Sequence, residues 1–213
     1  MSRSAPILVL ATALTLGCSL TSGAASSGGD TSILFQDDFS DTGSGWDRTT
    51  TDSSSTDYAS GAYRIWVNDT NSDFWANPGK SFTDAQVEVE AIKVAGPDDN
   101  DLGVICRYQD TDNFYFALIS SDGFAGIGKT KAGQQILLTG DKLTPADAIH
   151  QGNNKNTIRL DCVGSSLSLL VNGTQVITAT DSDFAKGDVG LIAGTYDTPG
   201  TDVQFDNFVV RAP

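Results

Sequence analysis

Residues 102–120, LGVICRYQDTDNFYFALIS, decide the fold because they form the clearest pair of strands in the chain. Two runs rich in apolar, β-branched and aromatic residues flank the polar sequence Asp110-Thr111-Asp112-Asn113. β-Branched and aromatic side chains favour strands, whereas Asp and Asn favour turns. The stretch therefore predicts a β-hairpin.

The side chains of this hairpin are predicted to divide between two faces, because successive residues of a strand point in opposite directions. If the apolar sets point inward, the opposite face carries Arg107, Asn113 and Tyr115. We predict that this second face is exposed. The predicted inward set is Val104, Cys106, Tyr108, Phe114, Phe116 and Leu118.

Most of the remaining chain repeats the strand-and-turn pattern. Asn172-Gly173 is a two-residue hairpin signal, and neither a long amphipathic helix nor a fixed-period repeat stands out. So many strands in one chain require two stacked sheets or a closed barrel. The predicted strands span 33–39, 62–68, 73–77, 85–94, 102–109, 113–120, 124–130, 135–138, 156–163, 166–171, 174–180, 187–194 and 203–211.

The composition is acidic. The chain has 27 Asp and Glu against 13 Lys and Arg, a formal net charge of −14, and its only glutamates are Glu88 and Glu90. Abundant Asp is typical of turns rather than of helix surfaces. The negative charge disfavours nucleic acid and anionic membrane surfaces as partners, and it leaves divalent cations as candidates.

The N-terminus resembles a bacterial lipoprotein signal. Arg3 precedes a short apolar run, which ends in Leu14-Thr15-Leu16-Gly17-Cys18. Such a run is too short to span a bilayer. We therefore expect cleavage before Cys18 and lipidation of that cysteine. An ordinary secretory signal, cut near Ala24 or Ala25, is the alternative.

This N-terminus sets the expected domain organisation. Residues 1–17 form the signal peptide, the small polar residues 18–32 form a flexible tether, and residues 33–213 form one β-domain. We expect the protein to be exported and attached to the bacterial cell envelope through its lipid alone.

Cys106 and Cys162 are the remaining cysteines. Both occupy apolar positions in predicted strands, and an isolated pair outside the cytoplasm is readily oxidised. We predict a disulfide between them. Two separate buried thiols are the alternative.

Three features suggest enzymes that the chain does not otherwise support. Residues 123–130, GFAGIGKT, match the phosphate-binding loop pattern, but no helical periodicity follows, so no nucleotide is expected. The only histidine, His150, lies in a polar loop without a neighbouring nucleophile. Glu88 and Glu90 alternate on one strand face, and we interpret them as a solvated outer face rather than as a catalytic pair.

Two further groups suggest ligands. Asp38 and Asp206 lie on the first and last predicted strands and could converge on a structural Ca²⁺, with solvated strand ends as the alternative. Arg107, Asn113 and Tyr115 combine planar polar groups with an aromatic ring, as sugar-binding faces do. The further candidates for that face are Trp66 and Trp75, although either could instead cap the core.

Several motifs together resemble concanavalin A-like jelly rolls, and more narrowly the laminin-G-like and 3-keto-disaccharide hydrolase-like domains of bacterial exported proteins. The resemblance spans residues 33–211 and implies an all-β, two-sheet antiparallel jelly-roll sandwich. The motifs are Asp37-Asp38-Phe39-Ser40 with Gly45-Trp46, residues 103–110 with Asn113-Phe114-Tyr115, Val171-Asn172-Gly173, residues 187–191 and Phe205-Asp206-Asn207-Phe208.

The resemblance also implies a function. Such domains mostly act as sugar-binding or adhesive modules, and Asp206 matches the position of a calcium ligand in related glucanases, whose Glu-x-Asp-x-x-Glu catalytic motif is absent from this sequence. We expect a surface-anchored, non-catalytic module that binds an oligo- or polysaccharide. The alternatives are a hydrolase of a modified disaccharide or glucan, using Glu88, Glu90 or Asp residues, and an adhesion protein with a protein partner.

Overall fold

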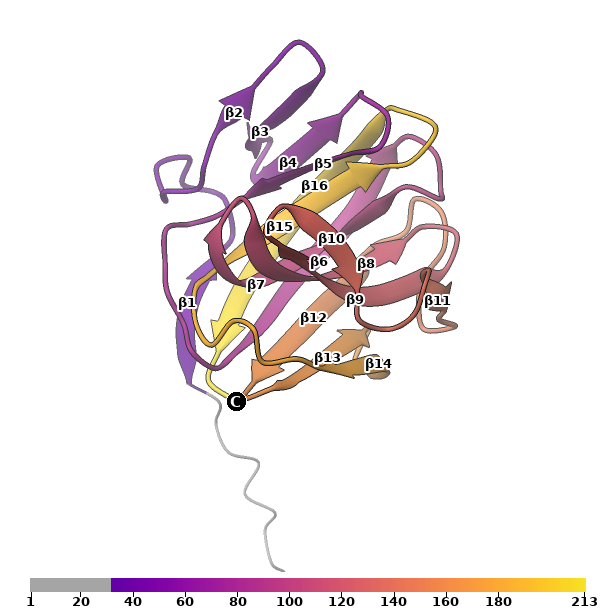
Figure 1. The fold of residues 1–213 in the computed structure, drawn as a ribbon. Helices are drawn as coiled ribbons and strands as arrows, with labels where there is room; N and C mark the ends of the chain where they lie inside the picture. The colour runs from indigo at the N-terminus through magenta and orange to yellow at the C-terminus, as the bar shows by residue number, and fades with distance from the viewer. Residues whose placement is uncertain (1–31) are drawn as a thin grey trace, which may run out of the picture. The chain divides into compact units, whose positions relative to one another are not determined.

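A computed structural model describes residues 32–213. The predicted signal peptide, Cys18 and nearly all of the predicted tether lie outside the described residues. The described part forms sixteen strands in two antiparallel sheets (Figure 1). It contains no helix with the length and apolarity needed to cross a bilayer.

The larger sheet has nine strands. They are β1 (Ile33–Asp37), β2 (Thr49–Thr50), β3 (Ser54–Ala59), β4 (Ala62–Val67), β6 (Ala85–Ala95), β12 (Asn156–Val163), β13 (Ser166–Val171), β14 (Thr174–Thr180) and β16 (Thr201–Arg211). Their order is β14-β13-β12-β6-β16-β4-β3-β2, and β1 pairs with the C-terminal half of β16.

The smaller sheet has seven strands. They are β5 (Ser72–Ala76), β7 (Asp101–Asp110), β8 (Asn113–Ser120), β9 (Phe124–Lys131), β10 (Gln134–Leu137), β11 (Thr144–Pro145) and β15 (Asp188–Thr195). Their order is β10-β9-β8-β7-β15-β5, and β11 pairs with β9.

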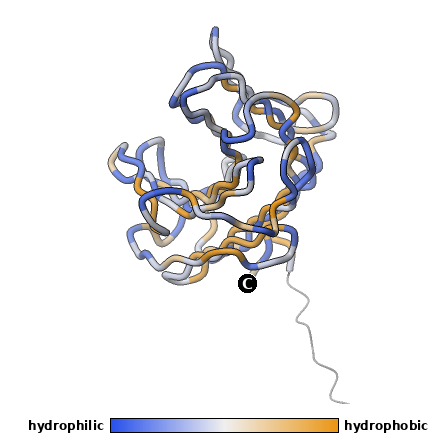
Figure 2. The backbone as a smooth tube through the Cα atoms, turned by 90° about the vertical axis from the view of Figure 1, so that its right-hand side faces the viewer, coloured by the Kyte–Doolittle hydropathy of each residue, from blue (hydrophilic) through white to orange (hydrophobic). Residues whose placement is uncertain are grey.

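The main core lies between the two stacked sheets. Figure 2 shows hydrophobic stretches running through the body of the domain and hydrophilic ones in many of its outer loops. On β6, Val87, Val89 and Ala91 point inward and are buried. Burying a side chain of the size of Val contributes about 1.5–3 kcal/mol. The predicted all-β, two-sheet antiparallel sandwich is confirmed, and the closed barrel is excluded.

Every predicted strand is present, but three short strands were not predicted. They are β2, β3 and β11. The sequence of β3, SSTDYA, hides its alternation because its inward residues include the polar Ser54 and Thr56. Both are fully buried and hydrogen-bonded, Ser54 to the Thr51 hydroxyl at 2.6 Å and Thr56 to the amide of Thr49 at 3.0 Å.

The predicted disulfide is present. Cys106 on β7 and Cys162 on β12 are bonded across the core, with 6.8 Å between their Cα atoms. The bond joins the two sheets.

The predicted division of the hairpin between two faces is wrong for β8. Cys106 pairs with Tyr115, so both side chains point into the main core. Phe114, Phe116 and Leu118 therefore point away from it, onto the far face of the seven-stranded sheet, where neighbouring residues bury them as a second cluster.

A bulge in β7 explains why Tyr108, which was predicted to point inward, also lies on the far face. Arg107 adopts a left-handed backbone conformation, with φ of 52°, and the β7–β8 register shifts between Cys106 and Asp110. Such a bulge reverses the alternation beyond it. Tyr108 consequently joins the second cluster instead of the main core.

Candidate ligand-binding groove

Arg107 is a structural residue, not the exposed ligand-binding residue that was predicted. It is 3% exposed. Its guanidinium donates to the carbonyl oxygens of Thr83, Gly164 and Phe184, at 2.7–3.0 Å, and to Asp84 at 3.1 Å. A planar group with several fixed donors suits this role. Arg107 thus ties three separate loops to β7.

Tyr115 is also buried, which corrects its predicted exposure. Its hydroxyl donates to Asp181 Oδ1 at 2.5 Å and accepts from the amide of Phe184 at 3.1 Å. Lys129 forms ion pairs with Asp181 and Asp183. Burial, together with the bond to Asp181, raises the pKa of Tyr115 to about 12. This network fastens the segment before β15 to the sheet and occupies the Tyr115 hydroxyl.

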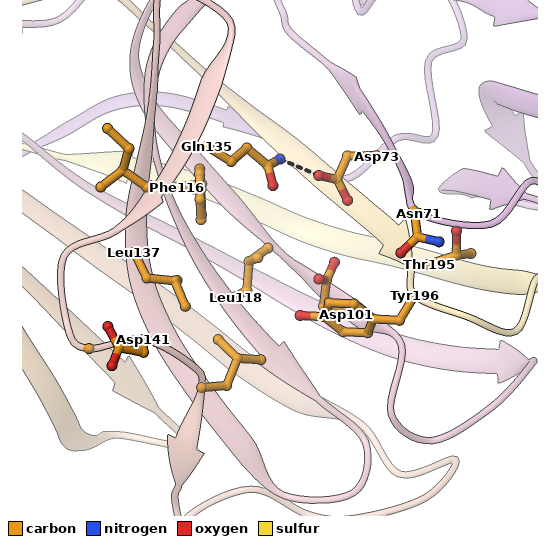
Figure 3. Close-up of a pocket in the computed structure, with 13 residues that line it drawn as sticks. Asn71, Asp73, Asp101, Phe116, Leu118, Gln135, Leu137, Asp141, Thr195 and Tyr196 are labelled. Atoms are coloured by element: carbon orange, nitrogen blue, oxygen red, sulfur yellow. Dashed lines mark hydrogen bonds between the residues drawn. The ribbon is translucent and has the colours of Figure 1, made fainter.

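The outer face of the seven-stranded sheet is concave. Gln135 Nε2, on edge strand β10, donates a hydrogen bond to Asp73 Oδ2, on edge strand β5 at the opposite end of the sheet (Figure 3). Opposite edges of one sheet can meet only if the sheet curls. Trp75 of β5 also packs on Phe114 of β8, with ring centroids 5.3 Å apart.

Three adjoining hollows form a groove along this concave face. The central hollow has a volume of about 510 Å³ and shares Asn71, Asp73 and Gln135 with a hollow of about 400 Å³ beside Trp75. On its other side it adjoins a hollow of about 380 Å³, with which it shares Leu137, Asp141, Leu143 and Tyr196. We call these three hollows together the groove.

The floor of the central hollow is apolar. Phe116, Leu118 and Leu137 line it (Figure 3). The glycines of the GFAGIGKT sequence make room for this floor: a Cβ on Gly128 would lie 2.4 Å from the Phe116 ring, and one on Gly126 would lie 2.6 Å from Leu143. This segment is strand β9, so its glycines serve packing rather than a strand–loop–helix phosphate site.

Aromatic rings are exposed along the groove. Tyr196 is 40% exposed and Phe124 is 36% exposed, and both line the outermost hollow. Trp75 is half-buried and lines the hollow at the other end. Exposed rings on a concave surface suit the C–H face of a sugar, because each ring offers a flat apolar surface.

A pair of carboxylates faces the central hollow. A Cβ built on Gly194 would lie 1.8 Å from Asp73 Oδ1 and 2.8 Å from Asp101 Oδ1, so the two oxygens are close neighbours. Asp101 is 4% exposed, and its Oδ1 has no hydrogen-bond donor. Figure 3 shows Asp73, Asp101 and Tyr196 on one side of the hollow, with Phe116 and Leu137 on the other.

This environment holds a proton on Asp101. Burial, reinforced by the negative charge of Asp73, raises the pKa of Asp101 from 3.8 to about 8. Burial raises the pKa of Asp73 as well, although the hydrogen bond from Gln135 opposes the shift. Burial and the nearby Asp101 also raise the pKa of Tyr196. The pair therefore shares one proton at neutral pH.

The other predicted ligand residues are dispersed. Asn113 closes the β7–β8 turn, where it donates to Asp110 at 2.8 Å and accepts from the amide of Ala132 at 3.2 Å. Trp66 alternates with the buried Ile65 and Val67 and lies on the outer face of the nine-stranded sheet. Of the predicted residues, only Trp75 lines the groove.

Glu88 and Glu90 lie on the solvated outer face, as predicted. Glu88 is paired with Arg211 at 3.0 Å, and Glu90 is paired with Lys155 at 2.7 Å. Lys155 lowers the pKa of Glu90. Each carboxylate therefore has its own cation, unlike the acid of a hydrolytic pair.

The predicted calcium ligands each accept hydrogen bonds from residues close to them in sequence. Asp38 accepts from the Ser40 amide and hydroxyl, and Asp206 accepts from the amide of Asn207. A hollow of about 410 Å³ between β1 and β16 is lined by Asp38 and Asn207 but not by Asp206. Calcium binding at Asp38 and Asp206 stays a prediction.

Sequence reasoning missed Asp73, Asp101 and Tyr196. The run Asp98-Asp99-Asn100-Asp101 indicates a solvated turn, yet Asn100 and Asp101 are buried. No local pattern joins Asp101 on β7 to Asp73 on β5, because β15 lies between these strands in the sheet. The only sequence signal was that Asp101, next to the predicted strand 102–109, does not continue its alternation of apolar residues.

Comparison with known proteins identifies the architecture. By sequence, the chain matches neither a protein-family profile nor a curated protein. By structure, it is similar to the carbohydrate-binding module CBM66 from Bacillus subtilis, with 17% identity, a TM-score of 0.64, and coverage of 79% of this chain and 96% of that chain. A protein of unknown function with a galectin-like fold, from the same organism, gives 10% identity, a TM-score of 0.60, and coverage of 84% of this chain and 95% of that chain.

A glycoside-cleaving enzyme has the same fold. The β-glucanase of Bacillus licheniformis is 13% identical, with a TM-score of 0.58 and coverage of 84% of this chain and 97% of that chain. These identities establish the fold and not the activity. The chain is a concanavalin A-like jelly-roll sandwich, an architecture that carbohydrate-binding modules and glycoside hydrolases share.

Proposed function

We propose that this protein binds an oligo- or polysaccharide non-catalytically in the groove of the seven-stranded sheet. The observation that carries the proposal is the line of accessible aromatic rings, Trp75, Tyr196 and Phe124, along one concave surface. Three adjoining hollows match an extended chain better than a single small molecule. The similarity to CBM66 supports the proposal at the level of fold.

Affinity electrophoresis and calorimetry on a panel of soluble polysaccharides test this function. We expect at least one polysaccharide to be bound, and Tyr196→Ala and Trp75→Ala to weaken that binding about tenfold each, because losing an aromatic contact costs about 1–2 kcal/mol. Trp66→Ala is the matched control, since its ring lies on the other sheet. Absence of binding across the panel, or an equal loss in Trp66→Ala, would contradict the proposal.

A hydrolase is the second candidate, and the Asp73–Asp101 pair favours it. Two neighbouring carboxylates, one held neutral, are the groups that glycoside hydrolysis uses as acid and as base or nucleophile. Incubating each bound polysaccharide with the protein and measuring new reducing ends tests this alternative. Activity that Asp101→Asn abolishes while binding persists would favour hydrolysis over simple binding.

We also propose that the domain is held at the bacterial cell envelope by lipid on Cys18. The support is the sequence Leu14-Thr15-Leu16-Gly17-Cys18 after a short apolar run. Metabolic labelling with a fatty acid is expected to mark the wild-type chain and not Cys18→Ser. Labelling of both, or of neither, would contradict lipidation at this residue.

A further inference from the structure

The groove has a strong charge bias. Its three hollows are lined by many carboxylates and by one cationic side chain, Lys142. A concave surface of one charge sign raises the local concentration of oppositely charged ligands. The bias disfavours uronic acids and sulfated sugars, whose anionic groups these side chains would repel. The carboxylates are Asp73, Asp99, Asp101, Asp112, Asp122 and Asp141.

The central hollow also contains a buried acceptor, Asp101 Oδ1, that no other residue bonds. Asp101 lines it, is 4% exposed, and has an Oδ1 that accepts no hydrogen bond. Asp73 Oδ1 lies close to that atom. Because no other residue bonds Asp101 Oδ1, the proton shared with Asp73 is its only donor, and an ammonium group can replace that proton with three donors.

We propose that this hollow binds the protonated amine of a de-N-acetylated hexosamine unit, so that the preferred ligand of the groove is a cationic glycan. This inference rests on the proposed carbohydrate-binding function and names its ligand class. An ammonium group has three donors and a positive charge, which match Asp73, Asp101 and the Tyr196 hydroxyl.

The apolar floor favours an amino sugar over a metal ion. A hexosamine whose amine faces Asp73 and Asp101 can set its C–H surface against Ile136 and Leu137, the accessible apolar residues that line the hollow. A divalent cation requires oxygen ligands around it and makes no use of such a floor. A volume of about 510 Å³ is enough for a sugar ring.

N-acetylation provides a sharp contrast. The acetyl group removes the positive charge and leaves one N–H donor in place of three. The site would then keep an unneutralised carboxylate beside a bulkier group. Because a charged hydrogen bond adds about 1.5–3 kcal/mol, the free amine should bind about 10- to 100-fold tighter than its acetylated counterpart.

Isothermal titration calorimetry of the full chain tests the inference. The probes are oligomers of glucosamine and of N-acetylglucosamine of equal length, in buffer acidic enough to charge the amine, with spermine and calcium chloride as separate probes. We expect at least tenfold preference for the free amine. Asp101→Asn and Asp73→Asn should each remove that preference, whereas Asp52→Asn, the same change on an exposed loop outside the groove, should keep it.

The other outcomes each have one meaning. Equal affinity for both oligomers overturns the inference and leaves the carbohydrate-binding proposal standing. Absence of binding by both oligomers and by the whole polysaccharide panel overturns the proposed function too. Spermine binding as tightly as the free-amine oligomer overturns the role of the sugar. Calcium binding that Asp101→Asn abolishes, without any preference for the amine, assigns the pair to a metal instead.

Discussion

Replacing Asp101 by Asn should stabilise the ligand-free protein at neutral and alkaline pH. The substitution keeps the shape of the side chain and removes its ability to ionise. Asp101 is buried beside Asp73 and Gly194, where a second negative charge has little compensation. The side-chain amide introduced by Asp101→Asn would donate a hydrogen bond toward Asp73. Wild-type Asp101 can donate that bond only while it is protonated.

The pH dependence follows from the direction of the pKa shift. The pKa of Asp101 is about 8 in the folded state against an ordinary 3.8, so between these values the folded protein holds a proton that the unfolded chain has lost. The free energy of unfolding therefore falls as pH rises through this window and levels off above it. At about 1.4 kcal/mol per pH unit, the largest possible loss is about 6 kcal/mol.

The expected gain is smaller than this limit, because the new amide is itself a buried polar group. An imperfectly bonded amide costs about 1–3 kcal/mol, so we expect a net gain of about 2–4 kcal/mol at pH 8 or above. For a domain of this size that corresponds to about 5–12 °C in Tm. The gain should shrink toward zero, or become a small loss, near pH 4.

Thermal unfolding followed by circular dichroism between about pH 4 and about pH 9, without glycan or metal, measures this difference. Asp52→Asn is the control, because its carboxylate is exposed in both states. Parallel curves for wild type and Asp101→Asn, with a constant difference in Tm, would show that Asp101 is already ionised in the folded protein. The account of a shared proton would then be refuted.

Three further predictions concern the scaffold. Replacing Cys106 and Cys162 together by Ala should lower the free energy of unfolding by about 4 kcal/mol in urea titrations, because the bond closes a loop across 56 positions; a change below about 1 kcal/mol would contradict this. Arg107→Lys should lower the free energy of unfolding by about 2 kcal/mol or more in the same titration, because an ammonium group cannot reach three carbonyls. It should leave polysaccharide retention intact. Lost retention at unchanged stability would restore Arg107 as a ligand residue. Gly103→Ala should prevent soluble expression or lower the free energy of unfolding by about 3 kcal/mol or more, because the new Cβ would lie 1.9 Å from the Ala117 carbonyl oxygen. A variant with the wild-type Tm would contradict the packing described for β7 and β8.

The strands were predictable because alternation is a local property. From Ala85 to Ala91 on β6 and from Ile158 to Cys162 on β12, inward apolar residues alternate with outward polar ones, and burial follows that pattern. The missed strand β3 shows the limit of this signal. Its inward Ser54 and Thr56 are polar, and their hydrogen-bond partners cannot be read from their own sequence.

The faces of the β7–β8 hairpin were not predictable for a different reason. A two-layer sandwich normally has one buried and one wet face per sheet, so the larger apolar set is expected inside. Here the curled sheet buries both faces of β8, which places Tyr115 in one cluster and Phe116 in the other. Alternation alone cannot assign two apolar sets to two buried faces, and the bulge at Arg107 further shifts the register.

The curl of the seven-stranded sheet is also what produces the groove. Residues of β5 and β10 sit at opposite edges, yet Asp73 and Gln135 meet over the face of β8. A flat sheet would leave Phe116 in water and would separate Trp75 from Tyr196. Curvature covers the apolar floor with polar walls and brings acidic side chains from distant strands to one hollow. Any ligand specificity of this protein therefore depends on how far β5 and β10 close over β8, and a substitution such as Gln135→Ala, which removes the bond between those edges, should change glycan affinity without altering the two-sheet core.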